Sequence, residues 1–374
     1  MSQESKTAAR PHLKVKEPWV RIIKRDSIPR HKAYTVRAVA LIGALLLGGI
    51  LILALGHNPF AVYREMVVGA FGSPLALKET TRITVPLLIT GLGIGIAFKM
   101  QFWNIGGEGQ IIAGAVAASY FALFQYQNIP GVLLPIVMVL AALLAGGLWG
   151  LIPAVFKAKW GTNETLFTLM MNYIALEVVR YFQFGPWRDP KQLGFPKMAM
   201  FADSARLPQV FGVHIGWIVA LLMVALAYFY MKKSKQGYEI TVVGESMRTA
   251  QYSGINVGRV LMRTMFISGA ICGLTGFFTV AGANYTLSES VTGGVGFTSI
   301  TVAWLANLNP IVMVLISIFL AMLQKGSNTI QTSFKIPSSA AEVLTGLILF
   351  FMLGCEFFLR YKLVFRSKGG RADA

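Results

Sequence analysis

Long runs of apolar residues, separated by short polar stretches, dominate this chain and predict helices that cross a lipid bilayer. A helix needs about 20 apolar residues to span roughly 30 Å of hydrocarbon. The pattern therefore predicts an all-α membrane protein with about ten transmembrane helices. The expected spans are 38–56, 83–98, 103–124, 132–156, 166–184, 212–231, 260–282, 294–308, 310–325 and 339–358.

The distribution of positive charge sets the expected orientation. The 374 residues are 55% hydrophobic and carry a formal net charge of +18, which in a soluble protein would suggest nucleic-acid binding. When the loops are assigned alternately to the two sides, 24 of the 34 Lys and Arg residues fall on one side. This bias is typical of cytoplasmic loops, so we expect both termini in the cytoplasm and no nucleic-acid partner.

Ten spans divide into two halves of five, and an odd number per half turns the second half upside down relative to the first. Inverted halves underlie many transport folds. We expect a ten-helix domain over 34–360, with basic cytoplasmic tails at 1–33 and 361–374.

The first tail allows two interpretations. Trp19, Ile22 and Ile23 stand at helical spacing among basic residues, which suits a helix lying on the inner membrane surface. A disordered basic tail held by anionic lipid fits equally well. Membrane lipid is a partner in both cases.

Two spans are interrupted by glycine and polar residues. The span at 294–308 is short and follows GGVG at 293–296, and the span at 103–124 opens with NIGGEGQ at 104–110. Irregular backbone at membrane depth is tolerated where it is buried in protein or lines a wet cavity. We interpret the two segments as pointers to a transport pathway, with local kinks of no transport role as the alternative.

Small residues at helix-packing spacing predict close helix contacts. Gly91 and Gly95 form one pair, Gly269 and Gly273 another, and Ala142, Gly146 and Gly150 make a stripe. Small side chains let helix backbones approach within a membrane.

Motifs for chemistry are missing from the sequence. It has no GxxxxGK[ST] phosphate-binding loop, so we do not expect this chain to hydrolyse ATP. No Ser, His and Asp residues group as a nucleophile and its base. Cys272 and Cys355 fall in apolar spans and are expected to be buried hydrophobes. We predict no catalytic residue, no metal site and no cofactor.

A few polar residues within the spans have two interpretations each. Glu108 either accepts hydrogen bonds from backbone amides of the glycine-rich turn or faces a conduit. Thr165, Thr168 and Asn172 form a polar stripe on one face of a helix, which predicts either hydrogen bonds between helices or a pore-lining surface. Glu177 and Arg180, three residues apart, are expected to pair.

The inside loop at 231–258 is long, mixed in charge and bounded by glycines. Ala250, Tyr252 and Ile255 are spaced to give a short helix with an apolar face. Such a helix is either a dock for a motor subunit or a surface helix without a partner.

Several motifs together resemble those of one transporter family. They are GAFGS at 69–73, PLLITGLG at 86–93, NIGGEGQ at 104–110, NET at 163–165, MNYIA at 171–175, the segment 244–255, and GFT at 296–298. With these motifs the chain resembles permease subunits of bacterial ABC importers of the ribose and branched-chain amino-acid class. It is most similar to the nucleoside-type branch.

The resemblance implies a role and a set of partners. The chain would form half of the translocation pathway for a small polar solute in the bacterial inner membrane. A nucleoside is the expected solute, and a sugar or other small solute is the alternative. The partners would be a second related permease, an ATP-binding subunit with two nucleotide-binding domains, and an extracytoplasmic substrate-binding protein.

The resemblance also implies site residues. The residues expected along the pathway are Asn104, Glu108, Gln110, Asn163, Glu164, Thr165, Thr168 and Asn172. Those expected to couple to the ATPase are Gly244, Arg248, Ala250, Tyr252 and Gly254. An ion-gradient-driven secondary transporter is the alternative from another class, and it would need an ion or proton site for which Glu108 alone is thin support.

Overall fold

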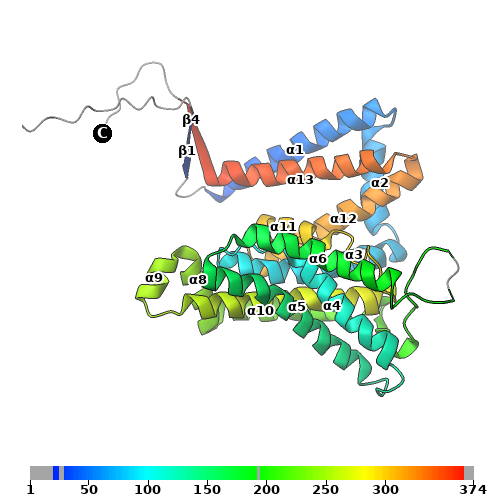
Figure 1. The fold of residues 1–374 in the computed structure, drawn as a ribbon. Helices are drawn as coiled ribbons and strands as arrows, with labels where there is room; N and C mark the ends of the chain where they lie inside the picture. Colours follow the sequence, from blue (N-terminus) through cyan, green and yellow to red (C-terminus); the bar gives the residue numbers. More distant parts are fainter. Residues whose placement is uncertain (1–19, 25–28, 192–193, 366–374) are drawn as a thin grey trace, which may run out of the picture. The chain divides into compact units, whose positions relative to one another are not determined.

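The structure, a computed structural model, describes residues 20–24, 29–191 and 194–365 and is built almost entirely of helices (Figure 1). The all-α prediction is confirmed. The chain divides into two compact units, which we treat separately: a terminal unit (residues up to 45 and from 348 onward) and a central unit (46–347).

The helices are α1 Arg30–Ala54, α2 Pro59–Phe71, α3 Pro74–Lys99, α4 Gly107–Tyr120, α5 Leu134–Trp160, α6 Glu164–Phe184, α7 Gly216–Lys233, α8 Lys235–Glu245, α9 Met247–Tyr252, α10 Val257–Phe277, α11 Val295–Leu305, α12 Pro310–Phe334 and α13 Ser338–Arg360. Two π-helical stretches, Phe121–Gln125 and Phe278–Asn284, extend α4 and α10, and a 3-10 turn covers Asp203–Ala205. The strands are β1 Val20–Lys24, β2 Gln209–Val210, β3 Val213–His214 and β4 Tyr361–Phe365.

Each of the ten expected spans falls on one of these helices. Within the described part of the chain, seven helices are long and apolar enough to cross a membrane: α1, α3, α5, α7, α10 with its π-helical extension, α12 and α13. The interrupted span at 294–308 is the short helix α11, of 11 residues. The class of membrane protein predicted from the sequence is therefore supported.

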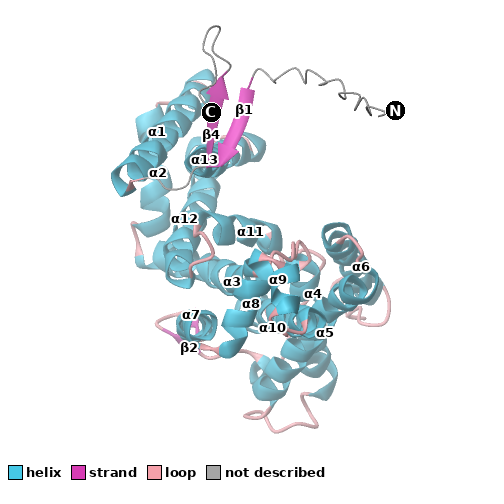
Figure 2. Ribbon diagram, turned by 90° about the vertical axis from the view of Figure 1, so that its left-hand side faces the viewer, coloured by secondary structure: helices cyan, strands magenta, loops and turns pink. Residues whose placement is uncertain are grey.

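Helix α10 lies at the centre of the central unit and packs against α3, α4 and α5; α4, α5 and α10 lie side by side in both views (Figures 1 and 2). The α5–α10 contact is a backbone-to-backbone approach. A Cβ added to Gly273 would collide with the carbonyl oxygen of Ala142, and one added to Gly146 would collide with that of Gly269. The two small-residue stripes are thus packing faces that meet each other, as expected.

The segment 56–81, treated as a loop in the sequence, contains helix α2. Asn58 caps it by accepting a hydrogen bond from Phe60 N at 2.9 Å, and Pro59 occupies the first helical position. Val62, Met66 and Ala70 are buried, and α2 packs against α12. The Asn-Pro pair is a helix-start signal that was present in the sequence.

In the terminal unit, β1 and β4 form an antiparallel pair, with Val20 opposite Phe365 (Figure 2). The interfacial helix considered for the first tail is wrong over Val20–Lys24, which is extended because it hydrogen-bonds to β4. Residues 1–19, 25–28 and 366–374 of the two tails, Trp19 among them, lie outside the described residues. An ion pair joins α1 to α13, with Arg37 Nη2 2.6 Å from Glu356 Oε1.

Candidate functional site

The start of α4 holds a buried cluster of polar side chains. Asn104 and Gln110 exchange amide hydrogen bonds, both of 3.1 Å, and Asn104 Nδ2 also donates to Ser268 Oγ of α10 at 3.2 Å. The Asn104 side-chain oxygen accepts a further bond from Gly106 N at 3.1 Å. Asn104 and Gln110 are 0% and 1% exposed. Buried amides are tolerated because they satisfy one another and the backbone turn before α4.

Helix α6 holds the same turn from the other side. Asn172 Oδ1 accepts a hydrogen bond from Gly109 N at 2.8 Å, and Asn172 Nδ2 donates to the Ile105 carbonyl at 3.0 Å. Thr168 Oγ1 accepts from Ile105 N at 3.3 Å. Thr168 and Asn172 are both buried. Of the two interpretations of the polar stripe, these contacts favour hydrogen bonding between helices for Thr168 and Asn172.

Glu108 joins the two interrupted segments. Its Oε2 accepts a hydrogen bond from Gly296 N, in the first turn of α11, at 2.7 Å, and the side chain is buried. One interpretation of Glu108 predicted hydrogen bonds from backbone amides of its own glycine-rich turn. The amide that its carboxylate accepts from belongs instead to the second glycine-rich segment, at 293–296. Because Glu108 also lies in the first turn of α4, its carboxylate is at the positive end of two helix dipoles.

The other three pathway candidates lie at the start of α6. Asn163 caps the helix, accepting from Thr165 N at 3.0 Å and Leu166 N at 3.2 Å. Glu164 forms an ion pair with Lys157 of α5 at 2.8 Å. For the residues that the structure describes, the backbone of this first turn reaches the cluster only through Thr168, whose hydroxyl donates to the Glu164 carbonyl at 2.7 Å and the Thr165 carbonyl at 3.2 Å.

The C-terminal half of α6 carries an exposed charged group that sequence reasoning recognised only in part. The expected pair of Glu177 and Arg180 is present, at 2.8 Å. Arg180 Nε also donates to Glu289 Oε2, in the segment before α11, at 3.0 Å. Periodicity suggested the first contact, but the second joins residues 109 positions apart and had no local signal.

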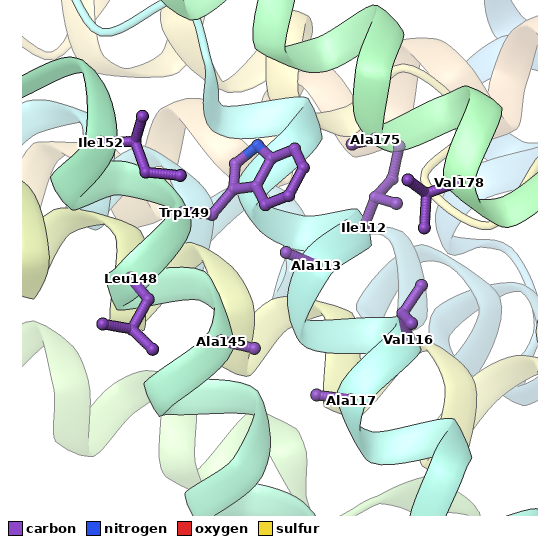
Figure 3. A pocket seen from close by; sticks show the side chains of 10 residues that line it. All are labelled: Ile112, Ala113, Val116, Ala117, Ala145, Leu148, Trp149, Ile152, Ala175 and Val178. Carbon is purple, nitrogen blue, oxygen red and sulfur yellow. The ribbon is translucent and has the colours of Figure 1, made fainter.

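An apolar cavity of about 320 Å³ lies between α4, α5 and α6 (Figure 3). Small residues line it, among them Ala113, Ala117, Ala145 and Ala175, and the indole ring of Trp149 closes one side (Figure 3). The indole Nε1 is buried without a hydrogen-bond partner. The lining offers almost no polar contact, so the cavity does not suit a polar solute.

The loop at 231–258 contains two short helices, α8 and α9. A short helix is present as predicted, but it ends at Tyr252 and leaves Ile255 outside. The predicted apolar face is wrong, because Ala250 and Tyr252 lie on different sides of α9. Ser246 caps α9, accepting from Thr249 N at 3.2 Å. Ala250 is fully buried, whereas Tyr252 is 93% exposed and Arg248 is exposed as well.

The base of this pair of helices is held firmly. Gly244 packs so closely on the end of α3 that an added Cβ would collide with the Lys99 carbonyl oxygen. Glu239 of α8 forms an ion pair with Arg263 of α10 at 3.0 Å. Gly254 ends the segment with a φ of +76°, a conformation that glycine adopts without strain. Helix α8, which leads directly into α9, is therefore anchored to α3 and α10.

The cysteines and the possible metal ligands are further candidates for a chemical role. Cys272 and Cys355 are buried and unpaired, as expected from their apolar surroundings. Among the described residues, no three His, Cys, Asp or Glu side chains gather as a metal ion would require.

Comparison with known proteins identifies the family of this chain. The family described as branched-chain amino acid transport system / permease component matches residues 76–353. The chain belongs to this family. The match covers the segments that hold the Asn104–Gln110 cluster, the α6 contacts and the α8–α9 pair.

Three relatives extend the match over most of the permease. A glucose ABC transporter permease protein of Haloferax volcanii is 32% identical over 94% of this chain and 95% of its own length. A guanosine ABC transporter permease protein of Bacillus subtilis is 32% identical, over 85% of this chain and 92% of its own. A nucleoside ABC transporter permease protein of Lactococcus lactis is 30% identical, over 85% and 90%. The family resemblance drawn from the motifs is confirmed, and the chain is an ABC transporter permease.

Proposed function

We propose that this permease forms half of the import pathway for a nucleoside. The observation that carries the proposal is the pair of relatives named for guanosine and nucleoside transport, each covering most of the chain. A sugar is the second candidate, because the relative named for glucose is equally similar and covers more of the chain.

The strand pair supports an even number of membrane crossings. With β1 paired to β4, residues 24 and 361 would lie on the same side of the membrane, and the chain between them would cross it an even number of times. Seven candidate spans is an odd number. Counting α4, α6 and α11 as crossings gives the ten expected from the sequence. The bias of Lys and Arg supports the cytoplasm as the side on which both termini lie.

Contacts in the central unit support two inverted halves. In such an arrangement α3 corresponds to α10, α4 to α11, and α5 to α12. With this correspondence, the contact of α3 with α11 is the counterpart of the contact of α10 with α4. In the same way, the contact of α3 with α12 is the counterpart of the contact of α10 with α5. All four pairs of helices are in contact. The interrupted helices α4 and α11, third in each half, meet at their N-termini through Glu108 and Gly296. Broken helices that meet near the midplane are typical of transporter folds.

The buried cluster has a structural role next to the pathway and does not itself line it. In this proposal Asn104, Glu108, Gln110, Thr168 and Asn172 hold the broken ends of α4 and α11 and fix α6 against them. Asn163, Glu164 and Thr165 lie at the cytoplasmic start of α6, where they would form the inner gate.

The α8–α9 pair would receive the ATP-binding subunit, which supplies two nucleotide-binding domains. The exposed Arg248 and Tyr252 would contact it, while Ala250, Gly244 and Gly254 give the tip its fixed shape. A second related permease would complete the conduit, and an extracytoplasmic binding protein would deliver the solute. The chain itself would hydrolyse no ATP, and it would reside in a bacterial inner membrane.

The test is uptake into vesicles that contain this permease with its second permease, ATP-binding subunit and binding protein. We expect accumulation of radiolabelled guanosine that requires ATP and persists when an ionophore collapses the ion gradients. Accumulation of glucose but not of nucleosides would transfer the proposal to the sugar. Uptake that continues without ATP and stops with the ionophore would contradict an ATP-driven importer.

A further inference from the structure

The exposed face of α6 carries a carboxylate near the middle of the helix. α6 has 21 residues, and Glu177 lies three residues, or about 5 Å, beyond its midpoint. The Glu177 side chain is 65% exposed and that of Arg180 is 47% exposed. Charged groups at this depth are strongly disfavoured next to lipid and mark ion or substrate pathways. With α6 counted as a membrane crossing, as proposed above, the part of this face that carries Glu177 would be unfavourable against hydrocarbon.

The same face carries two tyrosines. Tyr173, Glu177 and Tyr181 follow one another at intervals of four residues, so their side chains lie one above the other. Tyr173 is 59% exposed and Tyr181 is 68% exposed. Thr168, Met171 and Ala175, on the opposite side of the helix, are buried against the bundle. Met170, Ile174 and Phe184 are also exposed on this side of α6, so the face mixes aromatic, charged and apolar side chains.

A cavity lies near the C-terminal end of α6 and is linked to this face through the contact between Arg180 and Glu289, whereas the α6 residue that lines it, Gln183, is buried and lies off the face. Glu289, which accepts the hydrogen bond from Arg180, also lines this cavity of about 670 Å³ between the α6–α7 loop and the segment before α11. Gln183 of α6 lines it too, and its side-chain oxygen accepts from Glu289 N at 3.0 Å. The lining mixes Asp189, Lys197 and serines with apolar residues. Its volume falls in the range of small-molecule sites.

We propose that Tyr173, Glu177 and Tyr181 form the wall of α6 that contacts the transported nucleoside, with the cavity at Glu289 as its outer mouth. This inference rests on the proposed function. A nucleoside matches the wall because its base offers a flat face for stacking on tyrosine. Its ring N–H groups and ribose hydroxyls donate to the Glu177 carboxylate, and the Arg180 guanidinium donates to its carbonyl oxygens.

Thiol labelling of the assembled transporter tests whether water reaches the wall formed by Tyr173, Glu177 and Tyr181. Both native cysteines are buried, so the background is low. A charged, membrane-impermeant methanethiosulfonate should modify Tyr173→Cys and Tyr181→Cys at least ten-fold faster than Leu144→Cys, an exposed position on the apolar helix α5. Equal, slow labelling at all three positions would overturn the inference, because lipid or another protein would then cover the face.

Protection and transport identify the ligand. Guanosine with the binding protein should slow labelling of Tyr173→Cys, whereas glucose should not. Glu177→Gln should lower guanosine uptake roughly ten-fold at unchanged assembly, and Glu342→Gln, an exposed carboxylate on α13, should not. Protection by glucose alone, or full guanosine uptake by both Tyr173→Ala and Glu177→Gln, would overturn the assignment. Wild-type transporter that imports no nucleoside would refute the proposed function instead, and the labelling rates would still report on the wall.

Discussion

The Glu108 carboxylate in α4 accepts a hydrogen bond from the Gly296 amide in α11, across 188 positions of sequence and a distance of 2.7 Å. An added Cβ on Gly296 would collide with the Glu108 backbone and side chain, so the two helix starts touch directly. One buried carboxylate thus fixes both interrupted helices, and changes at this contact should be felt in both halves of the central unit.

Glu108→Leu should destabilise the permease by about 1–3 kcal/mol, because it leaves the buried Gly296 N–H without an acceptor. Glu108→Gln retains an acceptor oxygen and should lose less. Thermal unfolding of the purified transporter in detergent measures both variants. A Leu variant that melts with the wild type would mean that water or another group satisfies the amide.

Asn172→Leu and Tyr173→Leu should separate the two faces of α6. The Asn172 change orphans the Gly109 amide and the Ile105 carbonyl, so we expect lower thermal stability and poor assembly. Tyr173 is exposed, so its replacement should leave the melting temperature within about 2 °C while uptake falls. If Asn172→Leu assembled normally and Tyr173→Leu did not, the packing and transport roles that we assign to the two faces of α6 would be reversed.

Gly273→Ala should separate α5 from α10, since the new methyl group would collide with the Ala142 carbonyl oxygen. Overpacking of this kind costs about 1–3 kcal/mol, which should appear as reduced folded yield and a lower melting temperature. Gly346→Ala is the matched control, because nothing lies within 4 Å of the added atom. Equal yields of both variants would contradict the close approach of α5 and α10.

Arg248→Glu, combined with Tyr252→Ala, should abolish the stimulation of ATP hydrolysis in the assembled transporter and leave insertion and folding intact. Both side chains are exposed on α9, so their loss should not disturb the permease itself. Arg64→Glu, an exposed reversal on α2, serves as the control. Normal stimulation in the α9 variant would place the ATP-binding subunit elsewhere.

Local sequence signals were sufficient where the determining interactions are local. The apolar runs located the long helices, and the spacing of small residues identified packing faces on α5 and α10, although not that these two faces meet. Helix α2 was missed because its apolar stretch is too short to be taken for a span, although Asn58 and Pro59 mark its start.

Interactions between distant segments could not be predicted in this way. The partner of β1 is about 340 residues away, so a stretch with helical spacing of apolar residues forms a strand instead. In α6, periodicity identified the stripe of Thr168 and Asn172 but not the helix that it faces. Glu177 is exposed because none of the other described helices packs over its side of α6, and the sequence of α6 alone does not indicate which sides are covered.

The pairing of β1 with β4 brings residues 20–24 and 361–365 side by side. Removing either tail to improve expression would leave the remaining strand with an open hydrogen-bonding edge, which invites edge-to-edge association between molecules. Fluorescent reporters fused before β1 and after β4 would sit close together and give efficient energy transfer, a direct readout of whether the pair persists during transport.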